Sequence, residues 1–443
     1  MNILKIKFVW VITIAVLTLG YLASCTKNDQ YIGPKAKVSE TTLISKKVTT
    51  GPTVDGTVDA AWNDAAKITV SPQVPDPGNA MFTGYIGENY STTMRSMYDN
   101  QYIYFLVEVV DNTKSFKASP WYFNATTKRW AQESNARTFD PSGVLIREGY
   151  GEDKLAFLWN IDNSTAKFTS QTCYSSCHIF TPYLNYAVTP PAMKSNSGSG
   201  NHYTNGANEK IDMWWAHPGR GLVYNIMDDN YQDWAGGPNV TSLVGGSGNG
   251  RHFDDLVVSG ASTTWPNAPT YTADATQGSL TNRQSLKLND TGVVITVPFW
   301  VVPNATNSEY ILASDTLAGG IARKVTKVDL DGVLYYNGGT IDPNVGTDYQ
   351  RLGTTAKSPI GSKCFPSLVL APVLRGRADI TCYTTYTGSG WVYEIKRLLK
   401  TADVLKQDVD FSSLEDQPFG IAYFNQSNYQ HGIKPNLMLK FEK

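Results

Sequence analysis

Charge is scarce in this sequence. Asp, Glu, Lys and Arg make up 17% of its 443 residues, and the formal net charge is −1. Nucleic-acid binding needs clustered positive charge, so this composition argues against a nucleic-acid partner. The sequence also lacks a Ser-His-Asp order, a phosphate-binding loop and a dinucleotide-binding fingerprint. These absences argue against the enzyme classes that depend on such motifs.

Long apolar runs are missing except at the N-terminus. There, two lysines precede a short apolar run, and the segment Leu22-Ala-Ser-Cys25 follows, with two small residues directly before the cysteine. The run is shorter than the roughly 20 residues that span a bilayer, so it predicts a secretory signal peptide over 1–24. Small residues directly before a cysteine are typical of a lipobox, in which Cys25 is acylated and becomes the mature N-terminus.

The polar residues 25–40 read as a tether between this lipid and a folded domain. We therefore expect an exported protein, lipid-anchored to a bacterial membrane on its periplasmic or cell-surface side.

The rest of the chain is rich in residues that favour strands and turns. The full sequence holds 25 Tyr, 11 Trp, 37 Gly and 22 Pro, which predicts many short strands. Strands are expected at 91–98, 102–110, 154–160, 293–298, 391–395, 419–424 and 437–441. Without repeats or heptads, these strands predict an all-β antiparallel sandwich over 41–443, with long loop insertions. The Gly- and Asn-rich stretch 219–284 is expected to be a loop that frames a ligand.

Five cysteines are present. One, Cys25, is assigned to the lipid. Cys364 and Cys382 flank strand-like sequence, and a structural disulfide is their plainest interpretation in an oxidising compartment. The other two stand in Cys173-Tyr-Ser-Ser-Cys177-His178.

This Cys-His segment has the residues that attach a haem covalently. Attachment needs two thiols near the two vinyl groups and an imidazole that can reach the iron. The usual spacing has two residues between the cysteines, and here there are three. One helical turn would still place Cys173 and Cys177 on one face. A Cys173–Cys177 disulfide and a metal site remain alternatives, although structural zinc would need a fourth ligand.

Other candidates carry weaker signals. Asp212, Asp228 and Asp229 could bind a cation or cap loops, and their spacing does not distinguish these roles. His217 stands beside Trp214 and Trp215, which could pack on a porphyrin face, but packing in the core or a loop is its expected role.

The chain resembles the haem-binding domain of ethylbenzene dehydrogenase gamma subunits and related DMSO-reductase-type gamma subunits. The resemblance runs from about Pro52 to the C-terminus. Its motifs, in order, are Asp55-Gly-Thr-Val-Asp-Ala-Ala-Trp62, Tyr98-Asp-Asn-Gln-Tyr-Ile-Tyr-Phe-Leu-Val107, Glu152-Asp-Lys-Leu-Ala-Phe-Leu-Trp159, the Cys-His segment, Glu209-Lys-Ile-Asp-Met-Trp-Trp215, Asp228-Asp229 and Trp391-Val-Tyr-Glu-Ile-Lys-Arg-Leu398.

The resemblance implies an immunoglobulin-like sandwich with haem held between loops near one end. In the gamma subunits the haem is b-type and is bound by Met and Lys. This chain departs from that pattern, because its Cys-His segment lies where the methionine loop would be. It therefore resembles a c-type branch with one covalent haem c and His178 as an axial iron ligand. The segment 428–434 matches the place of the family's lysine, so His431 is the first choice for the other ligand and Lys434 is its alternative.

We therefore expect an electron-transfer protein rather than an enzyme, acting alone or as the haem subunit of a redox complex. Its partners would be redox proteins and, through the lipid, a membrane. The alternative is a carbohydrate-binding β-sandwich lipoprotein displayed at the surface, because the opening motif and the aromatic content are also similar to family 9 carbohydrate-binding modules. The Cys-His segment distinguishes the two, since a sugar-binding module does not need it.

Overall fold

The computed structural model describes most of the chain from residue 40 onward. The described residues are 40–443 without 79–81, 177–182, 186–191, 195–201, 205, 207, 234–250, 255–256, 260–261, 265–278, 289–290, 304–308 and 346–363. Residues 41–443 form one compact unit. The predicted signal peptide, the lipid-bearing Cys25 and nearly all of the tether lie outside the described residues.

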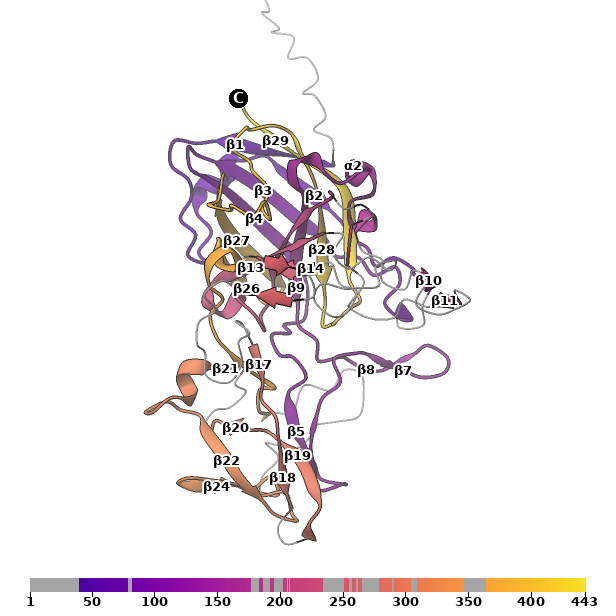
Figure 1. Cartoon of the computed structure of the whole chain (residues 1–443), viewed down its shortest axis with the longest axis vertical. Helices are drawn as coiled ribbons and strands as arrows, with labels where there is room; N and C mark the ends of the chain where they lie inside the picture. Colours follow the sequence, from indigo (N-terminus) through magenta and orange to yellow (C-terminus); the bar gives the residue numbers. More distant parts are fainter. Residues whose placement is uncertain are drawn as a thin grey trace, which may run out of the picture. The chain divides into compact units, whose positions relative to one another are not determined.

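Ten strands form a closed ring of hydrogen-bonded neighbours. In order around the ring they are β1 (Thr42–Lys47), β29 (Gly432–Phe441), β28 (Gln417–Phe424), β9 (Lys154–Asn160), β12 (Ile211–Ala216), β13 (Ile226–Gln232), β26 (Ile380–Tyr386), β27 (Gly390–Leu398), β4 (Tyr102–Val110) and β3 (Thr92–Tyr98). All neighbours are antiparallel except at β1, which runs parallel to both β29 and β3. Strand β1 therefore closes the ring, and Figure 1 shows it beside the C-terminal strand β29.

The other strands are short. At the ring, β2 (Lys67–Val70) pairs with β3 and β14 (Arg251–Phe253) pairs with β13. Away from the ring are β5 (Trp121–Asn124), β6 (Arg129–Gln132), β7 (Thr138–Phe139), β8 (Leu145–Arg147), β10 (Tyr183–Asn185), β11 (Ala192–Lys194), β15 (Val257–Ser259), β16 (Ser262–Thr264), β17 (Ser279–Thr281), β18 (Gln284–Lys287), β19 (Val294–Val297), β20 (Trp300–Val301), β21 (Ile311–Leu312), β22 (Arg323–Val328), β23 (Leu334–Tyr336), β24 (Gly339–Ile341) and β25 (Leu368–Leu370).

Helices are short as well. They are α2 (Phe168–Gln171) and the 3-10 helices η1 (Ala60–Asp64), η3 (Ile161–Asn163), η4 (Thr172–Ser175), η5 (Leu222–Tyr224), η7 (Ala313–Thr316) and η8 (Arg375–Ala378). In the part of the chain that the structure describes, no helix has both the length and the hydrophobicity to cross a membrane.

The inside of the ring is filled by aromatic side chains. Trp159 lies 4.8 Å from Phe419 and 5.1 Å from Trp214, measured between ring centroids. Aromatic rings bury large areas and pack with a defined geometry, so these contacts fix strands from distant parts of the chain against each other. A separate apolar cluster, around Trp121 and Phe123, includes residues of β5, β6, β18, β19, β22 and β23.

The predicted all-β class is confirmed. The expected strands appear as β3, β4, β9, β19, β27, β28 and β29, with small differences at their ends. The turn between β3 and β4 is held by Asp99, whose carboxylate accepts hydrogen bonds from the backbone N–H of Gln101 and Tyr102, both at 2.8 Å. The finer prediction of an immunoglobulin-like sandwich is not confirmed, because the ladder closes on itself at β1.

The predicted Cys364–Cys382 disulfide is wrong, because both thiols are free in the structure. Cys382 lies on β26 within the core of the ring. Cys364 is buried elsewhere, with its Sγ 3.7 Å from Nζ of Lys117. Strand-like sequence around two cysteines does not determine whether their side chains share one core, and here they do not.

Candidate functional site

A cavity of about 240 Å³ lies on the outer face of the ring, over β9, β12 and β28. Successive side chains of a strand point to opposite faces. Phe157, Trp214 and Tyr423 face the interior of the ring. The residues directly before and after each of them in the sequence therefore point outward, into this cavity. The residues that line it are Ala156, Leu158, Cys173, His202, Met213, Trp215, His217, Arg220, Gln232, Arg251, Ala422, Phe424, Asn428, Tyr429 and His431.

The cavity brings together two of the residues that the sequence assigns to one haem. Cys173 comes from η4, His431 directly precedes β29, and both line the cavity. Cys177 and His178 lie outside the described residues. Lys434 is not among the lining residues; it pairs in register with Ile421, whose side chain lies in the interior core.

His431 has the features of a metal-binding imidazole. Its Nδ1 lies 2.6 Å from the carbonyl oxygen of Tyr429, and its ring stacks on Phe424 at 4.4 Å. Desolvation lowers the pKa of His431 to about 4, so the ring is neutral at pH 7. An Nδ1–H donated to a backbone carbonyl leaves the Nε2 lone pair for a metal. Within the described part of the chain, Nε2 has no hydrogen-bond partner.

His217 is a second neutral imidazole at the cavity. Desolvation, followed by the positive charges of nearby Lys154 and Arg220, lowers its pKa well below the usual value. Its Nδ1 is buried and makes no hydrogen bond to the described residues. The sequence favoured core or loop packing for His217 over a position at a porphyrin face, and the structure places it at the cavity. The signal was the alternation of Met213, Trp215 and His217, which share one face when the pattern of β12 is continued.

The polar wall of the cavity is cationic. The guanidinium groups of Arg220 and Arg251 lie over the Trp215 ring, 4.7 and 4.9 Å from its centroid. Desolvation, followed by the charge of Arg220, lowers the pKa of Arg251 to about 9. Asp228 pairs with Arg220 at 3.1 Å and with Arg377 at 2.7 Å, so it orients arginines. No carboxylate appears among the described lining residues, and the cavity therefore favours a ligand with anionic groups.

Comparison with solved structures finds the following distant likenesses. Two structures of a family 9 carbohydrate-binding module (CBM9) from Caldicellulosiruptor kristjanssonii, in complex with glucose and with cellotriose, are 7% and 8% identical to this chain. They match 90% of this chain and 95% and 93% of their own, with TM-scores of 0.24 and 0.23. At these TM-scores the likeness carries no argument about fold or function. No curated protein matches the sequence.

The sequence matches a family model described as ethylbenzene dehydrogenase over residues 59–435, which is most of the chain. This is a family of oxidoreductase enzymes, and it overturns the expectation that the protein is not an enzyme. The matched range includes the strands that carry the cavity, η4 with Cys173, and His431. The chain belongs to the ethylbenzene dehydrogenase family.

Proposed function

We propose that this chain binds one haem c at the cavity and transfers electrons, on its own or as the haem subunit of an oxidoreductase complex. Cys173 and Cys177 would form the thioether bonds, and His178 and His431 would be the axial ligands of the iron. When bound, the haem supplies a one-electron redox centre. Its direct partners would be redox proteins.

The observation that carries this proposal is the meeting of Cys173 and His431 at one cavity. The two residues lie far apart in the sequence, and they supply the two side-chain types that covalent haem needs, a thiol and a neutral imidazole. The described residues enclose about 240 Å³, less than the about 300–1,000 Å³ of pockets that bury a whole small molecule. They would therefore enclose only part of a haem.

Each wall of the cavity has a role in this proposal. Phe424 stacks on His431 and fixes the plane of its ring. Arg220 and Arg251 provide positive charge for the haem propionates, which are carboxylates. The same arginines lie over Trp215, the aromatic ring that a sugar would otherwise use for stacking. Carbohydrate binding at this cavity is therefore the less supported alternative.

We also propose that the protein is exported and lipid-anchored. Support comes from Leu22-Ala-Ser-Cys25 after a short apolar run. Acyl chains contribute about 0.8 kcal/mol per buried CH₂, so a multiply acylated Cys25 would hold the chain at a membrane. Cys25→Ala should release the protein from membranes without changing its visible spectrum. Persistence of the variant in salt-washed membranes would place the anchor elsewhere.

Covalent haem is tested by denaturation. The full chain is expressed with a haem-attachment system, denatured and separated on a gel that is stained for haem. We expect a stained band for the native sequence and none for the double variant Cys173→Ala/Cys177→Ala, with Cys364→Ala as the matched control that keeps the stain. A colourless native band from well-folded protein would refute covalent attachment.

A further inference from the structure

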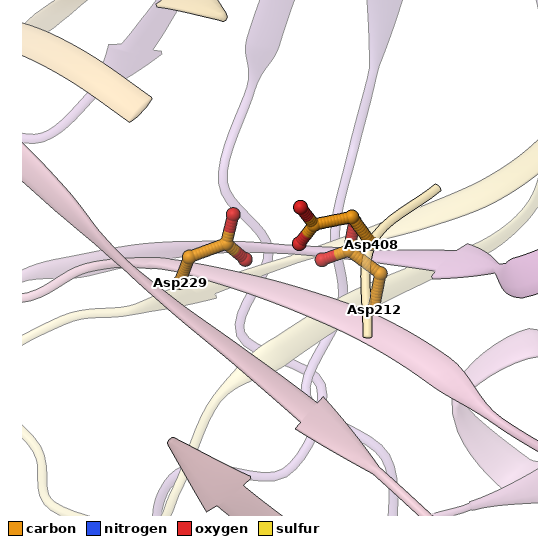
Figure 2. Close-up of side chains that lie close together, drawn as sticks. All are labelled: Asp212, Asp229 and Asp408. Atoms are coloured by element: carbon orange, nitrogen blue, oxygen red, sulfur yellow. The ribbon is translucent and has the colours of Figure 1, made fainter. Parts of the chain in front are cut away.

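The inner face of the ring carries a cluster of buried acids beside the aromatic core. Asp212 lies two positions before the core residue Trp214 on β12, and Asp229 lies two positions after the core residue Met227 on β13. Side chains two positions apart on a strand share a face, so both acids point toward the core. Asp408 approaches them from the segment between β27 and β28. One oxygen from each of the three carboxylates lies within 4.8 Å of the others. Figure 2 shows Asp229 pointing toward Asp212 and Asp408.

Each of these carboxylates accepts a hydrogen bond through one of its two oxygens. Asp212 accepts the backbone N–H of Val409 at 2.9 Å, and Asp229 accepts the backbone N–H of Asn230 at 3.1 Å. Asp408 accepts the hydroxyl of Thr401. The second oxygen of each is buried and makes no hydrogen bond to the described residues.

A fourth buried carboxyl group belongs to the same cluster. Asp254 follows β14 and is 2% exposed, and its backbone nitrogen lies 3.5 Å from the carbonyl oxygen of Asp229. Burial raises the pKa of Asp254, and so do the charge of Asp408, a side-chain hydrogen bond with Asp408, and the charge of Asp212. Its Oδ1 is also buried without a hydrogen bond to the described residues. This oxygen comes from a different segment of the chain, so it adds a buried oxygen without a hydrogen bond independently of the other three.

Among the described residues, one cation pairs with three of these acids. Arg397 on β27 lies 3.1 Å from Asp408, 3.5 Å from Asp212 and 3.7 Å from Asp229. Arg397 is also the only base among the groups that shift the pKa values of Asp212, Asp229 and Asp254 most strongly. Four carboxylates and one guanidinium leave a net charge of −3 when all are ionised. Burying such an excess is costly unless a further positive charge or protons compensate for it.

We propose that Asp212, Asp229, Asp408 and Asp254 form a binding site for a divalent cation that prefers oxygen ligands, and that this cation is Ca²⁺. The four side chains offer only oxygen, which suits Ca²⁺ or Mg²⁺ rather than zinc. Ca²⁺ binds oxygen at about 2.3–2.6 Å, so two ligands on opposite sides of one ion lie up to about 5 Å apart. The 4.8 Å limit fits this spacing. Mg²⁺ binds at about 2.0–2.1 Å, usually keeps several waters and is usually held by one or two carboxylates, so four protein carboxylates favour Ca²⁺.

A second cavity leads to this site. It measures about 230 Å³, and its lining includes Asp408 together with Asp162, Asp403 and Asp410. The lining also includes Lys400 and Lys406, which pair with Asp410 and Asp162. Asp403 and Asp408 are therefore the lining acids that would attract a cation. Asp408 is therefore shared between the buried cluster and an entry path, which a bound cation requires.

The test measures metal binding directly in the full chain after treatment with EDTA and desalting. Ca²⁺ is titrated by calorimetry, and Tb³⁺ is titrated by its luminescence on tryptophan excitation. Trp214 is a nearby donor, 5.1 Å from the Arg397 guanidinium. We expect one saturable site, Tb³⁺ luminescence that excess Ca²⁺ displaces, and a melting temperature raised by about 2–4 °C in 10 mM Ca²⁺.

The variants locate the site. Asp408→Asn should abolish the Tb³⁺ signal, and Asp254→Asn should weaken it at least about tenfold. Asp410→Asn is the matched control, because Asp410 lines the entry cavity but pairs with Lys400 outside the cluster, so its signal should persist. Three results would overturn the proposal. These are no binding of Ca²⁺ or Tb³⁺ by the native chain, a loss of Tb³⁺ signal in Asp410→Asn as large as that in Asp408→Asn, and a full Tb³⁺ signal in both Asp408→Asn and Asp254→Asn. Displacement by Mg²⁺ as effective as that by Ca²⁺ would overturn the assignment to Ca²⁺. If Asp408→Asn does not fold, the native titration and Asp254→Asn still decide.

Discussion

Strands β12 and β13 lie between two regions of opposite charge. Outward, Trp215 lies under Arg220 and Arg251 beside two neutral imidazoles. Inward, Asp212 and Asp229 meet in a cluster of acids. Because side chains alternate along a strand, neighbouring positions can serve two unrelated sites only a strand's thickness apart. The comparison teaches that one sheet can favour an anionic ligand on one face and a cation on the other.

The largest expected effect concerns the outer site. In the haem-loaded protein, His431→Ala should open a coordination position, shift the reduced spectrum toward high spin and allow carbon monoxide to bind. Lys434→Ala is the control and should change none of these, since Lys434 does not line the cavity. A low-spin spectrum that survives His431→Ala but is lost in Lys434→Ala would transfer the role to Lys434. If neither changes the spectrum, His217→Ala is the next variant to measure.

The inner site should dominate stability. Arg397→Met leaves the buried carboxylates without their cation, and removing one partner of a buried ionic group costs about 3–5 kcal/mol. Urea unfolding of the cation-free protein measures this loss. Lys400→Met is the matched control, because its pair with Asp410 is exposed and contributes about 0–1 kcal/mol. A loss in Arg397→Met no larger than in the control would mean that the acids are already neutral.

The two faces should respond oppositely to acid in protein without haem or cation. The pKa of His431 is lowered by burial to about 4, so the unfolded chain takes up the proton first and stability falls between about pH 6.5 and 4. The pKa of Asp212 is raised, mainly by burial, to about 7. At Asp212 the folded state therefore takes up a proton before the unfolded state does, so the contribution of Asp212 to stability rises as the pH falls from about 7 toward 3.8.

Urea unfolding across this pH range separates the two contributions. His431→Gln should reduce the loss of stability on acidification by about 1–2 kcal/mol, since His431 is only partly buried. Asp212→Asn should reduce the opposing gain. Identical pH profiles for both variants and the native protein would show that neither group titrates as its surroundings predict.

The smallest expected effect concerns Cys364 and Cys382. A disulfide closing this loop would contribute about 3 kcal/mol, whereas two free thiols contribute nothing that reduction can remove. Alkylation of denatured, unreduced protein should modify both residues, as mass spectrometry of their peptides would show. Finding them linked would restore the disulfide that the sequence predicted and contradict the structure.

Local features of the sequence were reliable guides to local structure. Runs of strand-favouring residues predicted β4, β9 and β28. The same runs did not predict the closed ring, because a strand-favouring sequence does not show which strand lies beside it. Closure depends on β1, whose short sequence gives no sign that it joins β3 to β29.

By itself the sequence determined the all-β class, the positions of the main strands, and the Cys173-to-His178 segment as the place to look for a cofactor. Only the tertiary structure decided that Cys173 and His431 line one cavity, that Cys364 and Cys382 are apart, and that four separate aspartates converge. The physical reason is the range of the forces involved. Strand and turn preferences act between neighbours in the chain, whereas a cavity or a charge cluster arises from pairings between segments that only the folded core brings together.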